Sequence, residues 1–126
     1  MADRTNFRLK DIIDAIDQIH TLLKNKTYQD LTTDKVVKAA FERFLEILSE
    51  ASRHIPDSLK ETRPEIPWRR VSDIVNHLRH AYDRVDSEIL WEVYSNGDLA
   101  VLREAVTDFL KKTLEQAPWF CAGQCA

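Results

Sequence analysis

Two histidines, an asparagine and two arginines lie within a few helical turns of one another in the second half of the chain. They are Asn76, His77, Arg79, His80 and Arg84. A histidine titrates near neutral pH and can take up or release a proton, and an arginine can hold a phosphate through two parallel hydrogen bonds. Cleavage of RNA without a metal ion needs a proton acceptor, a proton donor and a cation beside the phosphorane. The residue types in this stretch fit that chemistry.

The stretch from Trp68 to Asp86, which contains these residues, has the periodicity of an amphipathic helix. Its apolar face repeats every three or four residues and consists of Val71, Ile74, Val75, Leu78 and Tyr82. A second stripe consists of Asp73, Asn76, His77, His80 and Arg84. Pro67 suits the first helical position, because its φ is fixed and it has no N–H to satisfy. We expect one helix with an apolar face toward the core and a titratable face beside it.

The segment from Asn76 to Tyr82, followed by Val85-Asp86, resembles the signature helix of the HepT-like proteins of the HEPN superfamily. The pattern in that family is Arg, a spacer of four to six residues, His, any residue and Tyr. His80 and Tyr82 match its second half. Residues 40–51 are similar to the second helix of the family, and 66–68 and 89–91 match further landmarks. The resemblance extends from about Arg8 to Val106, which is most of the chain.

The resemblance implies an all-α, antiparallel bundle of four to five helices that dimerises, with two signature helices facing each other. It also implies a toxin-type ribonuclease with His80 as acid and base, Arg79 holding the phosphate and Asn76 orienting the imidazole or the substrate. Tyr82 would receive AMP from a partner, an MNT-type nucleotidyltransferase antitoxin, which silences the nuclease. The expected supporting residues are Asp73, Arg70, His77 and Arg84. His77 is a flanking residue, since position 79 is Arg where the pattern needs Tyr.

The chain departs from the family pattern at Val75, where the arginine is usual. Either Arg79 supplies the missing charge, or cleavage has been lost and the protein is an interaction module that keeps the dimer and the partner. A helical protein that binds a nucleotide or another small anion is a third interpretation. For His80 itself, the alternative is a surface histidine bonded to Asp83 or Asp73.

Other kinds of site have less support in the sequence. His77 and His80 share a helical face and Cys121 and Cys125 are the two cysteines, but their spacing matches no usual zinc pattern. With 2 Gly a phosphate-binding glycine loop is excluded. We therefore expect no metal and no cofactor. The carboxylates on the exterior of the second helix, Glu42, Glu46 and Glu50, are expected to be solvated, although Glu50 is also a candidate for a buried or half-buried pair with Arg43 that braces the signature helix.

Composition sets the class of protein. The chain has 126 residues, a net charge of −3 and few glycines and prolines, which favours one helical domain. The negative charge argues against binding of extended duplexes more than against cleavage of RNA at one point. No apolar run spans a membrane, no signal-peptide core is present, and both cysteines are expected to be free thiols. We expect a cytoplasmic protein with one domain over 1–116 and a disordered tail over 117–126.

The remaining helices follow from apolar periodicity and capping residues. We expect helices over 6–26, from the cap at Thr33 or Asp34 up to Pro56, over 88–94 and from the cap at Asp98 through Leu110, in addition to the signature helix. Residues 27–33 form a polar connection, Thr33 or Asp34 caps the second helix, and 57–65 form a loop with one turn at most. Asn96-Gly97 is a stop signal, and Asp98 caps the last helix. The many aromatic side chains exceed what one small bundle hides, so a homodimer is expected.

Overall fold

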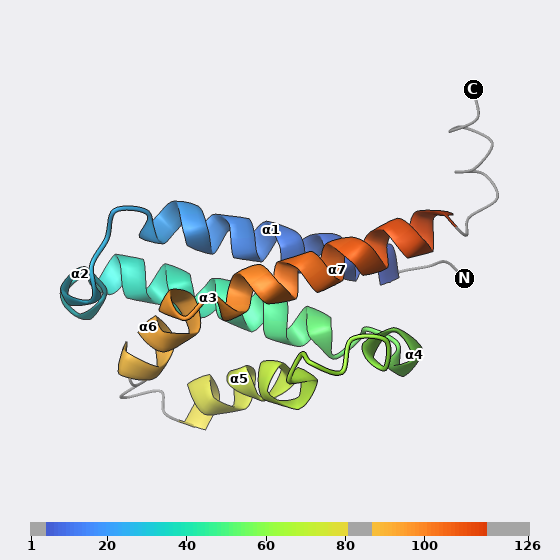
Figure 1. Cartoon of the computed structure of the whole chain (residues 1–126). Coiled ribbons are helices and arrows are strands. Elements are labelled where there is room, and N and C mark those ends of the chain that lie inside the picture. The colour runs from blue at the N-terminus through green and yellow to red at the C-terminus, as the bar shows by residue number, and fades with distance from the viewer. Residues whose placement is uncertain (1–4, 81–86, 116–126) are drawn as a thin grey trace.

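The protein is described here by a computed structural model that covers residues 5–80 and 87–115, without the side chains of 75–80, 87, 89, 114 and 115. The described residues form seven helices and no strand (Figure 1). The helices are α1 (Thr5–Leu23), α2 (Tyr28–Thr33), α3 (Lys35–Ser52), α4 (Asp57–Lys60), α5 (Trp68–His80), α6 (Ser87–Ser95) and α7 (Asp98–Glu115). The predicted all-α class is confirmed, and so are the five longer helices.

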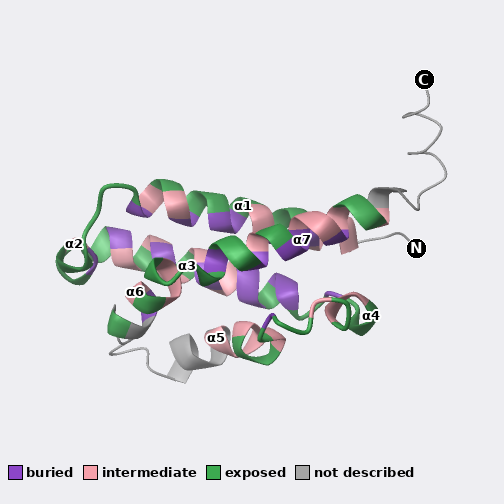
Figure 2. Ribbon diagram, viewed as in Figure 1, coloured by how far each residue is buried: buried purple, intermediate pink, exposed green. Residues whose placement is uncertain are grey.

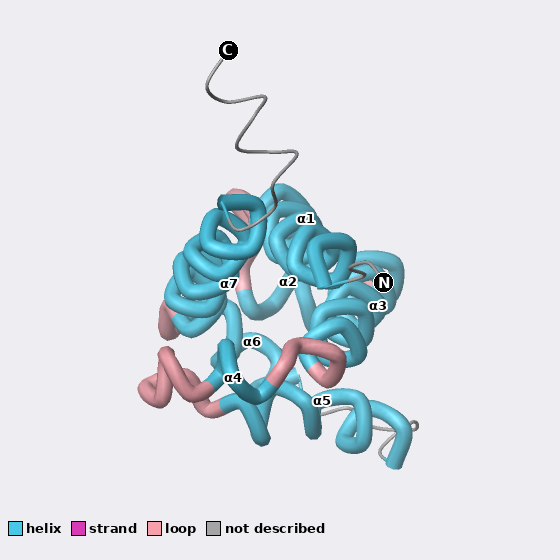
Figure 3. The backbone as a smooth tube through the Cα atoms, turned by 90° about the vertical axis from the view of Figure 1, so that its right-hand side faces the viewer, coloured by secondary structure: helices cyan, strands magenta, loops and turns pink. Residues whose placement is uncertain are grey.

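The three longest helices, α1, α3 and α7, form the centre of the bundle. α1 packs against both of the others, and α5 packs on the side of α3 that faces away from α1 (Figures 1 and 3). The buried face of α1 consists of Leu9, Ile12, Ala15, Ile16, Ile19 and Leu23. The three long helices α1, α3 and α7 turn their buried residues toward one another and their exposed residues outward (Figure 2). Full burial of a leucine or isoleucine side chain contributes roughly 1.5–3 kcal/mol, so this apolar core is the main stabilising element.

The connection between α1 and α3 differs from the prediction. α1 ends at Leu23 rather than at Lys26, because Asn25 adopts a left-handed φ of 62° and turns the chain. The predicted polar connection over residues 27–33 is wrong, since 28–33 form the helix α2. A capping box explains this helix: the Thr27 hydroxyl accepts from the Asp30 N–H (3.1 Å), and the Asp30 carboxylate accepts from the Thr27 N–H (2.9 Å).

The capping of α3 was predicted correctly for one of the two candidates. The Asp34 carboxylate accepts hydrogen bonds from the N–H groups of Val36 (3.0 Å) and Val37 (3.2 Å). α3 ends at Ser52, three residues before the predicted end at Ile55. The chain continues in a tighter turn there, with Ile55 N–H donating to Ser52 O (3.2 Å), and Ile55 is still buried. The apolar period therefore persists beyond the α-helical hydrogen bonds.

The junction between α6 and α7 has the predicted stop but a different cap. The Asn96 N–H donates to Glu92 O (3.1 Å), and Gly97 has a left-handed φ of 83°. Asp98 was predicted to cap α7, but it is the first residue of that helix. The Asn96 side chain accepts from the Asp98 N–H (3.2 Å) instead, so Asn96 serves both helices. None of the helices described is long and apolar enough to cross a membrane.

Candidate functional site

α5, the helix that carries the predicted site, is anchored at its first residue. The Trp68 Nε1–H donates to the carbonyl oxygens of Lys60 (3.2 Å) and Arg63 (3.1 Å). The Trp68 ring stacks on Phe109 of α7, with 5.8 Å between ring centroids and an interplanar angle of 26°. A large ring with a satisfied N–H fixes both the position and the direction in which α5 leaves the core.

A pair of buried serines on α3 sets the distance between α3 and α5. Ser49 Oγ donates to Ser72 O (3.0 Å), and Ser52 Oγ donates to Ser49 O (2.7 Å) and lies 3.4 Å from Ser72 Oγ. Both α3 serines are fully buried. Because these side chains are small, the two helix backbones approach closely, and the hydroxyls are satisfied without water. Val71 and Ile74 of α5 then pack against the core, as predicted.

The structure describes the side chains of the first half of the polar stripe of α5. Arg70 is exposed and Asp73 is half-buried. Asn76 and His80 follow Asp73 by three and seven residues within the same helix, so their backbone positions lie on its stripe. The structure does not describe the side chains of four predicted site residues, which are Asn76, His77, Arg79 and His80. Two further predicted residues, Tyr82 and Arg84, lie outside the described residues. The site itself therefore stays a prediction, carried on a helix whose placement is fixed.

The predicted brace between Arg43 and Glu50 is wrong. The Arg43 side chain is 70% exposed and pairs with Glu46 one turn along α3 (3.3 Å). Glu50 is about half exposed and pairs with His54 (3.5 Å). Exposed pairs of this kind contribute little to stability. The two buried serines, and not an Arg43–Glu50 pair, hold α5 against α3. No charge pattern in the sequence predicts this role.

Glu42 is a titratable group near α5 that was predicted to be solvated. It lies seven residues, or two turns, before Ser49, so it shares the face of α3 that contacts α5. Its side chain is half-buried, and burial raises the pKa of the carboxyl above its usual value. The sequence pattern did not predict this burial, since Glu42 stands among other acidic residues of α3.

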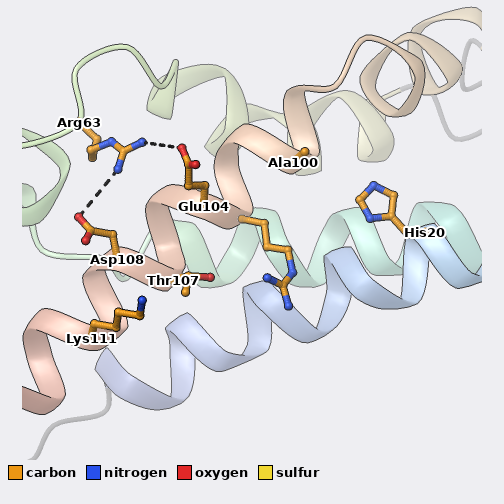
Figure 4. Close-up of a pocket in the computed structure, with 8 residues that line it drawn as sticks. His20, Arg63, Ala100, Glu104, Thr107, Asp108 and Lys111 are labelled. Atoms are coloured by element: carbon orange, nitrogen blue, oxygen red, sulfur yellow. Dashed lines mark hydrogen bonds and ion pairs between the residues drawn. The ribbon is translucent and has the colours of Figure 1, made fainter.

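A groove of about 530 Å³ between α1 and α7 is a structural feature and not the predicted site (Figure 4). It is lined by His20, Arg63, Ala100, Arg103, Glu104, Thr107, Asp108 and Lys111. Arg63 pairs there with Glu104 (3.5 Å) and Asp108 (3.8 Å) of α7. Its backbone carbonyl oxygen accepts the hydrogen bond from the Trp68 indole N–H. The ion pairs thus fix the connection from which α5 begins. No cluster of three or more metal-ligating side chains occurs among the described residues.

Comparison with known proteins identifies the family to which this arrangement belongs. The family model described as ribonuclease HepT-like matches residues 12–109, a range that includes all of α5. The chain belongs to the HepT-like ribonuclease family. The resemblance inferred from the motif is confirmed, and the HEPN superfamily fits the observed helical bundle.

Several curated relatives carry ribonuclease names. A protein of Thermococcus cleftensis named probable ribonuclease HepT is 40% identical over 84 residues, which are 67% of this chain and 76% of that protein. A protein of Methanocaldococcus jannaschii named as a candidate RNase is 34% identical over 84 residues, 67% of this chain and 69% of its own. A candidate RNase of Caldanaerobacter subterraneus is 28% identical and covers 82% of this chain and 92% of its own. No solved structure matches the chain.

Proposed function

We propose that this HepT-like protein is an endoribonuclease toxin that cleaves RNA without a metal ion at a site formed in a homodimer. The observation that carries the proposal is the family match over residues 12–109. The placement of α5 supports it, because Trp68 and Ser72 hold the helix rigidly while the stripe of Asp73 continues through positions 76 and 80. Rigid placement matters, since proton transfer needs heavy atoms within hydrogen-bonding distance.

His80 is the residue to which we assign the proton transfers. The 2′-oxygen of the RNA loses its proton and attacks the adjacent phosphorus, the bond from phosphorus to the 5′-oxygen breaks, and the 5′-oxygen gains a proton. A histidine with a pKa near neutrality serves both proton transfers. Asn76 lies one turn before His80 and orients the imidazole or the substrate. Arg70, His77 and Arg84 are the proposed supporting groups.

Arg79 is the proposed phosphate-binding cation in place of the arginine that Val75 replaces. Positions 75 and 79 are four residues apart in α5, so they share one face of the helix. Position 79 therefore lies one turn further along the same face of the helix as the position where the family pattern has arginine. Two parallel N–H groups of Arg79 would stabilise the charge that develops on the phosphorane.

Tyr82 is the proposed point of control. Transfer of AMP to its hydroxyl by an MNT-type nucleotidyltransferase antitoxin would place a bulky, negatively charged group two residues beyond His80. Such an adduct blocks the substrate and repels its phosphates. The expected partners are thus RNA, a second copy of the chain and the nucleotidyltransferase, within the cytoplasm.

An assay of RNA cleavage tests the proposal, with the intact mass checked first because an AMP adduct would mask activity. Unmodified protein should cleave single-stranded RNA in the presence of a metal chelator, and His80→Ala should lose the activity by at least about 100-fold. His54→Ala is the control, since His54 is a half-exposed histidine in the turn that follows α3. Equal cleavage by wild type and His80→Ala would overturn the assignment.

A second candidate function follows from Val75 alone. If unmodified, folded protein cleaves no RNA, the chain is an interaction module that has lost its nuclease activity together with the arginine. The variant Val75→Arg then shows whether the remainder of the site survives, because it restores the family pattern. Cleavage by this variant and none by wild type would establish the second candidate.

A further inference from the structure

Aromatic rings of α1, α2 and α6 contact one another in a row. These three helices meet at the end of the bundle where α1 leads into α2 (Figure 1). The Tyr28 ring lies edge-on to Trp91 of α6, with 6.3 Å between centroids. Trp91 contacts Tyr94 at 5.2 Å, and Tyr94 contacts His20 of α1 at 5.9 Å. Tyr28 is 39% exposed, so the row ends in a ring that is open to solvent. The rings behind Tyr28 hold it in one orientation.

Two exposed lysines precede this open ring in the chain. Lys24 and Lys26 lie in the connection from α1 to α2, and no ion pair involves either of them in the part of the chain that the structure describes. The nearest carboxylates in the chain, Asp30 and Asp34, are engaged in capping α2 and α3. Exposed Glu92 of α6 adds negative charge, so charge alone does not make this surface attractive to a polyanion.

We propose that the surface formed by Lys24, Lys26 and Tyr28 binds single-stranded RNA, with a base stacked on Tyr28 and phosphates beside the two lysines. The inference rests on the proposed ribonuclease function and locates where the substrate is held outside the cleavage site. A half-exposed ring that follows two exposed lysines by two and four residues suits a single strand, since unpaired bases expose their faces and a duplex hides them. α5 runs toward this end of the bundle, so a strand held here leads to the candidate site (Figure 1).

Replacement of the ring tests the stacking interaction. The probe is a short fluorescein-labelled single strand of 2′-O-methyl RNA, which has no 2′-hydroxyl and cannot be cleaved, and binding is measured by fluorescence anisotropy. Tyr28→Leu keeps an apolar side chain against Trp91 but removes the ring, and should weaken binding about tenfold. Tyr28→Phe keeps the ring and should bind as wild type does. Phe7→Leu is the matched control, because Phe7 is 69% exposed at the opposite end of α1.

The salt dependence of binding tests the two lysines. In Lys24→Gln/Lys26→Gln the slope of log affinity against log salt should become shallower by about 1.4, the value for two phosphate contacts to a single strand. A double variant of exposed lysines elsewhere on the surface, Lys10→Gln/Lys111→Gln, has the same change in net charge and should leave the slope unchanged. A fall in affinity with no change in slope would contradict phosphate contacts.

The two proposals fail in different ways. If wild type binds the probe through Tyr28 and the two lysines but cleaves no RNA, the surface is established and the nuclease assignment is not. If wild type cleaves RNA while Tyr28→Leu and the lysine variant bind the probe as wild type does, the inference is overturned. It is overturned equally if wild type does not bind the probe, or if Tyr28→Leu weakens only association between protein chains.

Discussion

The ion pair between Arg103 and Asp17 shows what a single contact contributes to this bundle. Arg103 Nε lies 2.7 Å from Asp17 Oδ1, and its Nη2 lies 3.1 Å from Oδ2, so the contact is bidentate and joins α7 to α1. The hydrogen bond from Arg103 is the main cause that lowers the pKa of Asp17 below its usual value. A lowered folded-state pKa means that the contribution is present above the unfolded pKa and is lost as pH falls through the folded pKa.

The first prediction is therefore a pH-dependent effect of Asp17→Asn. The variant should be less stable than wild type by about 0.5 kcal/mol at neutral pH, a small value because the pair is largely exposed. The difference should shrink as the pH falls below about 5, toward and past the unfolded pKa of an aspartate. Urea unfolding of both proteins across this range measures it. A difference that stayed constant with pH would show that the ionised carboxylate is not the source.

The pKa of Glu42 is shifted in the opposite direction to that of Asp17. Burial raises the pKa of its carboxyl, so its contribution to stability is present below the unfolded pKa and is lost as pH rises through the folded pKa. Glu42→Gln removes the charge and should raise Tm at neutral pH, with no gain at acidic pH where Glu42 is already protonated. Glu92→Gln, at an exposed glutamate of α6, serves as the control in thermal unfolding. A lower Tm of Glu42→Gln at neutral pH would show that the carboxylate has a stabilising cation partner.

The candidate site and its surroundings differ in what the sequence can predict. His80 and Tyr82 stay predictions, and they rest on the spacing of a family pattern, which needs no knowledge of packing. The departure at Val75 was visible for the same reason. The half-burial of Glu42 and the serine contacts could not be predicted, because Glu42, Ser49 and Ser52 resemble ordinary polar positions of a helix.

At the scale of the helices, the contact between α3 and α5 decides where the candidate site lies. Ser49→Leu should force α5 away from α3, destabilise the fold by roughly 1–3 kcal/mol and reduce RNA cleavage strongly. Ser49→Ala removes one hydroxyl and keeps the close approach, so it should cost about 1 kcal/mol and leave most of the cleavage. Chemical unfolding and the cleavage assay together measure both variants. Full activity in a folded Ser49→Leu protein would show that the spacing is not needed.

Helix type and order followed from periodicity, whereas helix ends depended on local hydrogen bonds. α2 was missed because the six residues of Tyr28–Thr33 are too few to show an apolar period, although the capping box of Thr27 and Asp30 was present in the sequence. The cap of α7 was assigned to Asp98 instead of Asn96, because both residue types favour that role. Such choices between neighbouring residues are made by backbone geometry.

At the scale of the whole molecule, the proposed dimer predicts complementation between inactive chains. If each site takes residues from both subunits, His80→Ala and Arg79→Ala should each be inactive alone. With free exchange of subunits, half of the dimers are mixed and each has one intact site, so the mixture should recover about a quarter of the wild-type activity. Cleavage by the mixed and separate proteins measures this. No recovery, with exchange of subunits demonstrated, would place His80 and Arg79 of one site on the same chain.

Because α1 packs against α7, the core of this protein can fold only after α7 has been synthesised. Arg103 and Asp17 are 86 residues apart, and Trp68, which orients α5, stacks on Phe109. A ribosome-bound chain that has not yet exposed α7 therefore has an open core and an α5 without its support. Nascent chains and C-terminal truncations before residue 109 should lack an ordered candidate site. Cleavage by the proposed nuclease would then begin only after α7 has been made.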